Sequence, residues 1–418
     1  MRHYFVIALA VIFFAVSALL ISYSDGVKYI GRAVEFAGNQ LAALVTHNPK
    51  SVDYLKGKYQ SAGQEMPEKK IRILVMPGHE PMYGGAEFRD IKERDLNVEL
   101  ANNLAAFLGQ NTRYEVLVGR SADSWNLGLA EYFRSQWDEI IDWQKSYREE
   151  MSRLIAIGQV PELKPNFSNP DAPRDVALRL YGITKWAKEE DVDVAIHIHI
   201  NDYPGHGLWE RGPYSGFAIY VPASQYLNSV TTHAIADKVF NRLKKYNPVS
   251  NLPGESVGIL DEPEMIAIGA NNTADAASLL IEYGYIYEPQ FLSPEIRSSA
   301  LKDLAYQTYL GLQDFFDPAS AMAIARTYDT LVLPHAWTAP IKESNRANRD
   351  VFALQTALLF DGLYPPVGKD KNECPRTGRI GSCTKAAVAA FQEKYGIIGG
   401  EGNVGPKTIE ELNKLYGA

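Results

Sequence analysis

The sequence predicts an α/β protein: a layered, mixed sheet flanked by helices, preceded by an N-terminal transmembrane helix and followed by a small all-α domain of three helices. In the region 71–316, short strand-like runs alternate with helical patterns, as in layered α/β domains. These runs lie near residues 72–76, 114–118, 192–200, 215–221 and 276–281. An uncharged apolar run occupies residues 4–23, and a separate helical pattern begins at Asp350.

The size and composition of the chain limit the class of protein it encodes. A chain of 418 residues exceeds the size at which one hydrophobic core usually keeps growing, so we expect two or more domains. The hydrophobic content of 46% and the charged content of 22% are ordinary for globular proteins. Because the formal net charge is -8 and no basic stretch stands out, the sequence argues against a nucleic-acid partner.

The N-terminal apolar run, residues 4–23, is long enough to cross a bilayer, which takes about 20 residues in a helix. Residues 15–18 (AVSA) offer a cleavage site for a signal peptide, but residues 19–21 continue the apolar run beyond it. We therefore expect an uncleaved, single-pass anchor in the inner membrane, with the rest of the chain on the extracytoplasmic side. If the segment is cleaved, the protein is secreted instead.

The next elements follow from their polar and apolar spacing. The polar segment 24–70 is predicted to be a stalk, helical in part over 27–44. Leucines and Phe107 recur at helical spacing over 95–108, which predicts an amphipathic helix. A further helix is predicted over 293–316, because it opens with a serine cap followed by a proline and an acidic residue.

Residues 122–170 form an insertion that is predicted largely as one long helix. Apolar and aromatic side chains at helical spacing mark one face: Leu129, Phe133, Trp137, Ile140, Ile141, Gln144, Tyr147 and Met151. This face either packs on the sheet or belongs to a lid that covers a functional site or binds a regulatory protein. The sequence leaves both interpretations open.

The C-terminal part of the chain is predicted to contain a linker, residues 317–349, and a separate helical domain, residues 350–418. The only two cysteines, Cys374 and Cys383, are separated by residues that favour turns. We expect a disulfide between them, which fits an exported protein, and two free thiols are the alternative.

Four polar residues lie at or just beyond the ends of strand-like runs: His79, Glu93, His199 and Glu282. Strand ends are places where a fold can gather distant side chains into one site. Two imidazoles and one carboxylate are the ligand set of an open catalytic zinc site, which keeps one coordination position for water. A further glutamate at the end of an apolar run is what such a site needs as a general base.

The third run, residues 192–201, carries two histidines. Residues two apart on a strand point to the same face, so His197, His199 and Asn201 share one face while valines and isoleucines line the other. Both histidines are therefore expected to face the site.

Three sequence blocks resemble a known family. The block PGHEPMYGGAEFRDIKERDLN, which starts at Pro77, resembles the first block of the zinc-dependent N-acetylmuramoyl-L-alanine amidases of bacterial cell walls. The block AIHIHIN resembles the family's Ser-Ile-His-Ala-Asn block, and LLIEYGYI resembles its Leu-x-Glu-x-Gly-Phe block. The resemblance covers roughly residues 71–316 and implies an amidase catalytic domain there.

The resemblance also implies roles for individual residues. His79, Glu93 and His199 match the positions that bind Zn²⁺ in the family, and Glu282 matches the catalytic glutamate. His199 is selected over its neighbouring histidine because an asparagine follows it after one residue, as in the family.

The chain departs from the family pattern at a few positions. His197 stands where the family usually has serine, Met76 where an aspartate is common, and Glu80 where glycine is common. None of these changes removes a ligand. We expect His197, Asn201 and Glu80 to hydrogen-bond a metal ligand or the substrate.

The C-terminal pattern is similar to the small helical peptidoglycan-binding domain found beside wall hydrolases. Its signatures are Leu354-Gln355, Ala387-Val388, Phe391-Gln392, Gly405 and Thr408. The alternative is a generic three-helix bundle that binds no ligand.

Together, the resemblances imply zinc-dependent hydrolysis of the amide bond between N-acetylmuramic acid and L-alanine in peptidoglycan, during wall remodelling or division. Two alternatives stay open from the sequence. The protein could be a catalytically inactive wall-binding scaffold or activator, or a zinc peptidase that cuts within the stem peptide.

Overall fold

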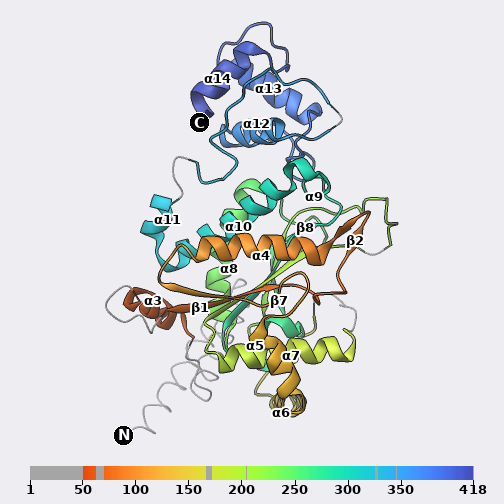
Figure 1. Cartoon of the computed structure of the whole chain (residues 1–418), viewed down its shortest axis with the longest axis vertical. Helices are drawn as coiled ribbons and strands as arrows, with labels where there is room; N and C mark the ends of the chain where they lie inside the picture. Colours follow the sequence, from red (N-terminus) through yellow and green to blue (C-terminus); the bar gives the residue numbers. More distant parts are fainter. Residues whose placement is uncertain are drawn as a thin grey trace, which may run out of the picture.

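A computed structural model describes residues 50–62, 70–165, 172–203, 205–324, 328–344 and 346–417. It confirms a mixed α/β architecture with a mostly parallel central sheet and a separate group of C-terminal helices (Figure 1). The predicted membrane segment 4–23 and the predicted helix over 27–44 lie outside the described residues. In the part of the chain that is described, no helix is both long enough and apolar enough to cross a bilayer.

Six strands form the central sheet, in the order β4-β1-β5-β8-β6-β7. Neighbouring strands are parallel except for the pair β6 and β8. The strand bounds are β1 (Ile71–Pro77), β4 (Tyr114–Val118), β5 (Val194–Asn201), β6 (Ala218–Pro222), β7 (Ile259–Glu262) and β8 (Ala277–Tyr285). A short hairpin of β2 (Glu87–Phe88) and β3 (Ile91–Lys92) follows β1. The sequence analysis missed only β7 among the sheet strands, because it is short and half of it is acidic.

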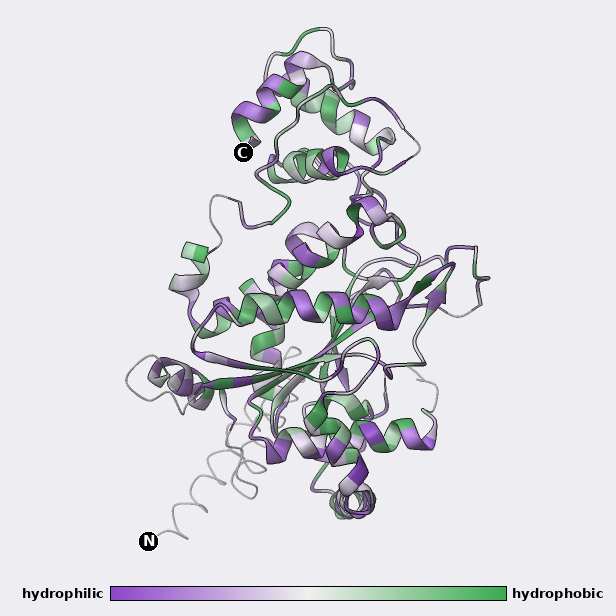
Figure 2. Ribbon diagram, viewed as in Figure 1, coloured by the Kyte–Doolittle hydropathy of each residue, from purple (hydrophilic) through white to green (hydrophobic). Residues whose placement is uncertain are grey.

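Helices cover both faces of the sheet (Figures 1 and 2). One face carries α4 (Glu93–Leu108), α8 (Ser229–Tyr246) and α10 (Pro294–Phe316). The other face carries α5 (Leu127–Ser135), α7 (Arg174–Glu189) and the short turns η2 (Ile266–Ile268) and η3 (Ala270–Asn272). The alternation of side chains along β1 shows why: Ile73 and Val75 are buried with the α4 layer, whereas Leu74 and Met76 are buried with the α7 layer.

Residues 52–61 of the predicted stalk belong to the α/β domain. They form α3 (Val52–Ser61), whose Leu55 and Tyr59 are buried in the main core. The Lys58 Nζ lies 2.6 Å from an Oδ of the fully buried Asp193, just before β5. The polar composition of this segment did not indicate that two apolar side chains and an ion pair attach its helix to the domain.

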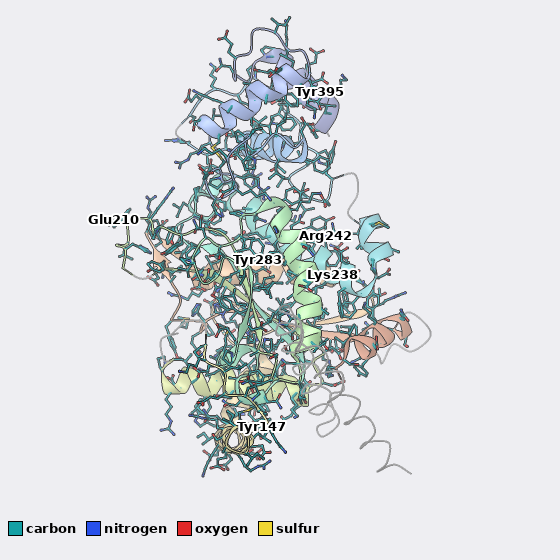
Figure 3. All side chains as sticks on the ribbon, turned by 180° about the vertical axis from the view of Figure 1, so that it is seen from behind. Tyr147, Glu210, Lys238, Arg242, Tyr283 and Tyr395 are labelled. Atoms are coloured by element: carbon teal, nitrogen blue, oxygen red, sulfur yellow. A yellow bond between two sulfur atoms is a disulfide. The ribbon has the colours of Figure 1, made fainter. Side chains whose placement is uncertain are left out.

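The insertion forms two helices, so the prediction of one long helix is wrong. The chain breaks at Gln136 between α5 and α6 (Trp137–Ala156). Leu129 and Ile140 of the predicted face are fully buried, the first near β1 and the second against α7. Figure 3 places Tyr147 of α6 at the opposite end of the molecule from Tyr395 of the C-terminal domain.

The predicted linker is also more ordered than expected. It begins with α11 (Pro318–Ile324), and Trp337 further along is buried in the core of the C-terminal domain. The Trp337 indole donates a 2.9 Å hydrogen bond to the Asp350 carbonyl, and its backbone amide donates to the Asn413 side chain. Packing of this tryptophan therefore ties part of the predicted linker to the C-terminal domain.

Three helices form the C-terminal domain: α12 (Arg349–Phe360), α13 (Ser382–Lys394) and α14 (Pro406–Tyr416). The glutamines of the two sequence signatures are buried and have equivalent roles. The Gln355 amide donates to the Thr384 hydroxyl at 2.9 Å, and the Gln392 amide donates to the Thr408 hydroxyl at 2.9 Å. Each glutamine thus ties its helix to the first turn of the next one.

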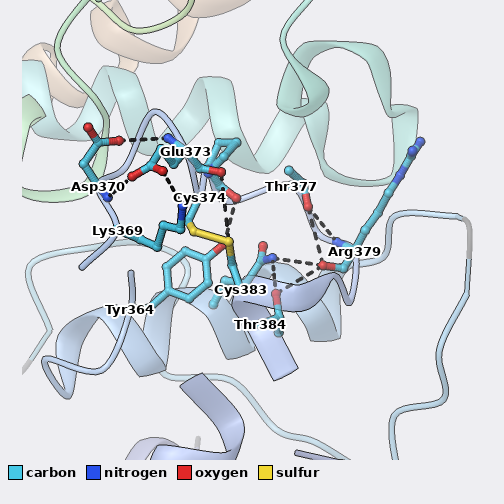
Figure 4. The surroundings of a disulfide bond; sticks show 11 residues. Tyr364, Lys369, Asp370, Glu373, Cys374, Thr377, Arg379, Cys383 and Thr384 are labelled. Carbon is cyan, nitrogen blue, oxygen red and sulfur yellow. Dashed lines mark hydrogen bonds and ion pairs between the residues drawn. A yellow bond between two sulfur atoms is a disulfide. The ribbon is translucent and has the colours of Figure 1, made fainter. Parts of the chain in front are cut away.

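The predicted disulfide is present. Cys374 and Cys383 are bonded, with their Cα atoms 5.9 Å apart, and the bond connects the loop before α13 to its first turn (Figure 4). Because it closes a short loop beside the domain core, it limits how far this loop can open.

The C-terminal domain rests on α10 and α8 through a buried arginine. Arg376 lies 3.6 Å from the buried carboxylate of Asp303 in α10 and donates to the side chains of Asn247 and Thr356. Its guanidinium also lies 5.4 Å from the Tyr246 ring centre. A buried charge is stable only when it is paired and hydrogen-bonded, so these contacts fix the orientation of the domain.

Arg376→Ala is expected to lower the free energy of unfolding by about 3 kcal/mol or more, because it leaves the Asp303 charge buried without its partner. Urea unfolding followed by circular dichroism would measure the change. Arg349→Ala is the matched control, since the Arg349 side chain donates to a backbone carbonyl, that of Glu295, across the same interface. Equal losses in the two variants would contradict the central role of Arg376.

Candidate metal centre

His79, Glu93 and His199 come together at the carboxyl edge of the sheet. His79 directly follows the turn after β1, Glu93 is the first residue of α4, and His199 lies near the end of β5. One ligand atom from each of the three lies within 4.8 Å of the others. Because β1 and β5 are parallel neighbours, their carboxyl ends meet at one edge, and the hairpin after β1 returns the chain to place Glu93 there.

Glu93 bridges the two histidines. One Glu93 oxygen lies 2.8 Å from the His79 Nε2, and the other lies 3.2 Å from the His199 Nδ1. The two imidazole rings are 4.9 Å apart and nearly perpendicular. Backbone amides of Ala86 and Ile200 donate to the Glu93 carboxylate, at 2.8 and 3.2 Å. The carboxylate is therefore held on both sides, with both imidazoles directed toward it.

The charges of the site favour metal-ligand protonation states. Burial opposes ionisation of Glu93, but hydrogen bonds and charges of His199 and His79 outweigh it and hold the Glu93 pKa well below its usual range. Burial lowers the pKa of His199, and the nearby His79 adds to this effect. A metal ligand must be an ionised carboxylate or a neutral imidazole, and Glu93 and His199 are biased toward those forms.

The donor set fits a zinc ion. Two imidazole nitrogens and a carboxylate oxygen are ligands that Zn²⁺ accepts, and three protein ligands leave the open position of a catalytic site. The His79 Nε2 is buried and lacks a hydrogen bond of good geometry within the described residues, although it lies close to the Glu93 carboxylate. A cation between these atoms would satisfy both groups.

The turn that carries His79 is unusual. His79 has a φ of 67°, in the left-handed region that non-glycine residues rarely adopt. The buried guanidinium of Arg120, just after β4, donates to the carbonyls of Pro77, Gly78 and Arg94. These hydrogen bonds hold the turn that carries His79 in place. Burial lowers its pKa to about 10, so it stays charged at neutral pH.

Gly78→Ala is expected to weaken Zn²⁺ binding by about tenfold or more, because an alanine Cβ would lie 2.2 Å from the His199 ring and displace it. Competition with a fluorescent zinc chelator would measure the affinity. The matched control is Gly57→Ala in α3, where an added Cβ meets nothing within 4 Å. Unchanged affinity in Gly78→Ala would show that the ring position does not control binding.

Glu282 lies beside His199 on the neighbouring strand. The two are register partners of β5 and β8, and Glu282 shares its face with Leu280. Its Oε2 is buried and has no hydrogen-bond partner within the described residues. Burial, and then the charges of Glu93 and Glu255, raise the Glu282 pKa well above its usual value. A carboxyl group in this state accepts a proton readily.

The other three residues singled out in the sequence have separate contacts. His197 is buried and lies outside the metal-ligand cluster, and burial together with the charge of His199 lowers its pKa to about 3. The Asn201 amide donates to Glu255 at 2.9 Å. Glu80 pairs with the Arg179 guanidinium of α7 at 2.7 Å. Direct hydrogen bonds from these three residues to a metal ligand are not among the contacts of the described residues.

The sequence analysis missed Arg120 and Glu255. Glu255 is buried, accepts hydrogen bonds from the hydroxyls of Tyr220, Ser250 and Tyr285, and contributes to the raised pKa of Glu282. Arg120 directly follows a strand-like run, the same signal that identified His79. Glu255 lies in a proline- and glycine-containing loop, where no pattern marked it.

A cavity of about 800 Å³ opens beside the metal-ligand cluster. His79, His199 and His197 contribute to its wall, together with Trp125 and Lys164 from the insertion. The insertion therefore borders the cavity, although α5 and α6 pack on α7 rather than across the ligands. Its role as a lid or as a site for a regulatory protein stays a prediction.

Comparison with known protein families identifies the C-terminal part of the chain. The family model of a peptidoglycan binding domain matches residues 348–412, which include all three C-terminal helices up to Leu412. No curated protein matches the chain significantly.

Solved structures give weaker similarity. The chain is similar to the CwlD amidase from Clostridioides difficile in complex with the GerS lipoprotein, at 14% identity and a TM-score of 0.39, covering 60% of this chain and 100% of that chain. It is also similar to the N-acetylmuramyl-L-alanine amidase Ami1 from Mycobacterium smegmatis, at 14% identity and a TM-score of 0.39, covering 59% and 97%. For the amidase AmiC2 of Nostoc punctiforme, the identity is 16%, the TM-score 0.36 and the coverage 59% and 96%. Similarity at this level does not establish a function, which therefore has to come from the residues of this chain.

Proposed function

We propose that this protein is a zinc-dependent hydrolase of peptidoglycan that cleaves the amide bond between N-acetylmuramic acid and L-alanine. The observation that carries the proposal is the cluster of His79, Glu93 and His199 beside a large cavity, with Glu282 next to His199. A structural zinc site would use four protein ligands, whereas three ligands at a cavity are typical of a catalytic site.

The three ligands would hold the ion, and Glu282 would handle protons. When bound, Zn²⁺ supplies Lewis acidity that polarises the scissile carbonyl and lowers the pKa of water. Glu282 would take the proton of the attacking water on its buried Oε2 and deliver it to the leaving amine. The raised Glu282 pKa supports both steps, because a carboxyl group with a pKa nearer neutrality can accept and release a proton at working pH.

The remaining chain prepares these groups for the reaction. Arg120 holds the Pro77-Gly78 turn, and backbone amides hold the Glu93 carboxylate, so neither ligand has to reorganise when the substrate binds. Asn201 and Tyr220 donate hydrogen bonds to the Glu255 carboxylate and hold it in place. The charge of this carboxylate contributes to the raised pKa of Glu282. The cavity provides room for the groups on one side of the scissile bond.

The C-terminal domain supports peptidoglycan as the substrate. Its match to a peptidoglycan binding domain spans residues 348–412. A wall-binding domain attached to the hydrolase would raise the local concentration of scissile bonds. The disulfide between Cys374 and Cys383 is the kind of bond that persists outside the cytosol, where the wall lies. We therefore propose an extracytoplasmic catalytic domain, anchored in the inner membrane by residues 4–23.

Two measurements on the full-length protein test this function. Metal analysis should find about one zinc ion per chain, and mass spectrometry of digested sacculi should find glycan strands freed from intact stem peptides. Shortened stem peptides would identify a zinc peptidase instead. Wall binding without any cleavage product would identify an inactive scaffold or activator.

A further inference from the structure

Three exposed arginines lie where the catalytic domain meets the C-terminal domain. Arg89, Arg211 and Arg379 are all exposed, and none of their guanidinium groups has an ion pair or hydrogen bond within the described residues. The chain as a whole has a net charge of -8, so an unpaired group of cations is not a consequence of composition. We call these residues the arginine cluster.

Hydrogen bonds bring the three segments of the cluster together. The Arg89 amide donates to the Leu208 carbonyl at 3.0 Å, which joins the β2–β3 hairpin to the loop 205–216. In that same loop, the Ser215 hydroxyl donates to Asn372 of the C-terminal domain at 2.8 Å. Figure 3 shows Glu210 of this loop at the outer edge of the molecule, and Figure 4 shows the Arg379 side chain extending away from the disulfide.

The positive charges of the cluster act on one another. Partial burial lowers the pKa of Arg211, and the charges of Arg379 and Arg89 lower it further. The negative charge of Glu288 acts in the opposite direction and raises the Arg211 pKa. The Glu288 carboxylate is buried, however, and already accepts hydrogen bonds from the backbone amides of Tyr285 and Gly216. Like charges repel one another, and a bound anion would reduce this repulsion.

An exposed aromatic ring lies beside the cluster. The Trp209 side chain is 74% exposed, and its ring centre is 5.8 Å from the Arg89 guanidinium. The neighbouring Leu208 is 58% exposed. These two adjacent apolar side chains offer a contact surface for the uncharged face of a sugar ring.

We propose that the arginine cluster binds carboxylates of peptidoglycan stem peptides, while Trp209 contacts the adjoining sugar. The proposal deepens the proposed function and rests on it, because peptidoglycan is the polymer that offers repeated carboxylates beside uncharged sugar rings. Planar guanidinium groups are suited to carboxylates, which they bind through paired hydrogen bonds. Arg379 comes from the C-terminal domain and the other two from the catalytic domain, so one bound strand would contact both.

The docked position of the C-terminal domain is what makes such a composite site feasible. Arg376 and Asn372 hold the segment that carries Arg379 against Asn247 and Val249. The site therefore exists before the polymer binds, and binding does not have to bring two independent domains together.

The test compares binding to two forms of purified sacculi at low temperature, in full-length protein carrying Glu282→Gln to suppress digestion. One form is native, and the other has its carboxyl groups converted to amides. Adding Arg211→Gln and Arg379→Gln should weaken binding to native sacculi about fivefold or more at low salt, and should have no further effect on amidated sacculi. The matched control is Arg153→Gln, which removes an exposed arginine of α6 far from the cluster.

Three outcomes would overturn the proposal: native binding as strong as in the Arg153→Gln control, an equal loss on both forms of sacculi, or a loss confined to amidated sacculi. An equal loss on both forms would point to phosphate groups of the wall as the anion. Since the three arginines are exposed, we expect the variants to fold, and their thermal unfolding verifies this. Cleavage products from the protein with native Glu282 are scored separately, so failure of the proposed hydrolysis is distinguishable from failure of carboxylate binding.

Discussion

Replacing Glu282 with glutamine is expected to lower the rate of amide hydrolysis by about 100-fold to 10,000-fold, because glutamine cannot take a proton from water or give one to the leaving amine. The substitution preserves size, and the buried Oε2 has no hydrogen bond to lose within the described residues. The fold and the zinc content should therefore stay unchanged. The rate is measured on a soluble muramyl-peptide, so that wall binding does not limit it.

The matched control for this prediction is Glu131→Gln, which changes an exposed glutamate of α5 that pairs with Arg134. It should retain the full rate. If Glu282→Gln turns over at a similar rate with zinc bound, the proton shuttle has to be another group, and His197 is the first to examine, because its Nε2 is buried without a hydrogen bond within the described residues.

Replacing either His79 or His199 with alanine is expected to lower zinc affinity more than about 100-fold. Loss of a group that merely orients a ligand already costs roughly 10-fold to 100-fold, and loss of the ligand itself should cost more. Metal content after dialysis against a weak chelator would measure the effect. Hydrolysis should fall in parallel.

His197→Ser is the matched control for the ligand variants. It removes a histidine from the same face of the same strand, but one that lies outside the cluster of ligand atoms. It should keep its zinc. Zinc retained in both alanine variants, or lost in His197→Ser, would show that the metal is held by a different set of residues.

The positions of His79, His199 and Glu282 followed from the sequence because strand ends are recognisable in it, whereas Glu93 begins α4 and was identified through the resemblance. Apolar runs mark β1, β5 and β8, and the residues after or near their ends had to meet at one edge once these strands became parallel neighbours. The choice of His199 over His197 was different. Alternation put both on one face, and the resemblance made the choice that the geometry of the cluster agrees with.

What the sequence could not predict depends on contacts between distant segments. Arg120 donates to backbone carbonyls of the turn after β1, and such contacts leave no pattern in side-chain type. Glu255 and Trp337 lie in segments rich in turn residues, and only tertiary packing determines that both are buried. The break at Gln136 interrupts an apolar stripe that continues on both sides, so periodicity alone extended the helix through it.

The buried Arg376 contact has a consequence for how the protein would travel through the wall. When a flexible linker joins a binding domain to its enzyme, the enzyme can reach many bonds from one binding position on the wall. When the binding domain is held in one orientation, as here, the enzyme can reach only the bonds close to that position. Once those bonds are cut, the protein has to dissociate from the wall before it can cut others. Its cuts should therefore fall in short local clusters, separated by stretches of untouched polymer, and the rate of release from the wall would set the pace of digestion.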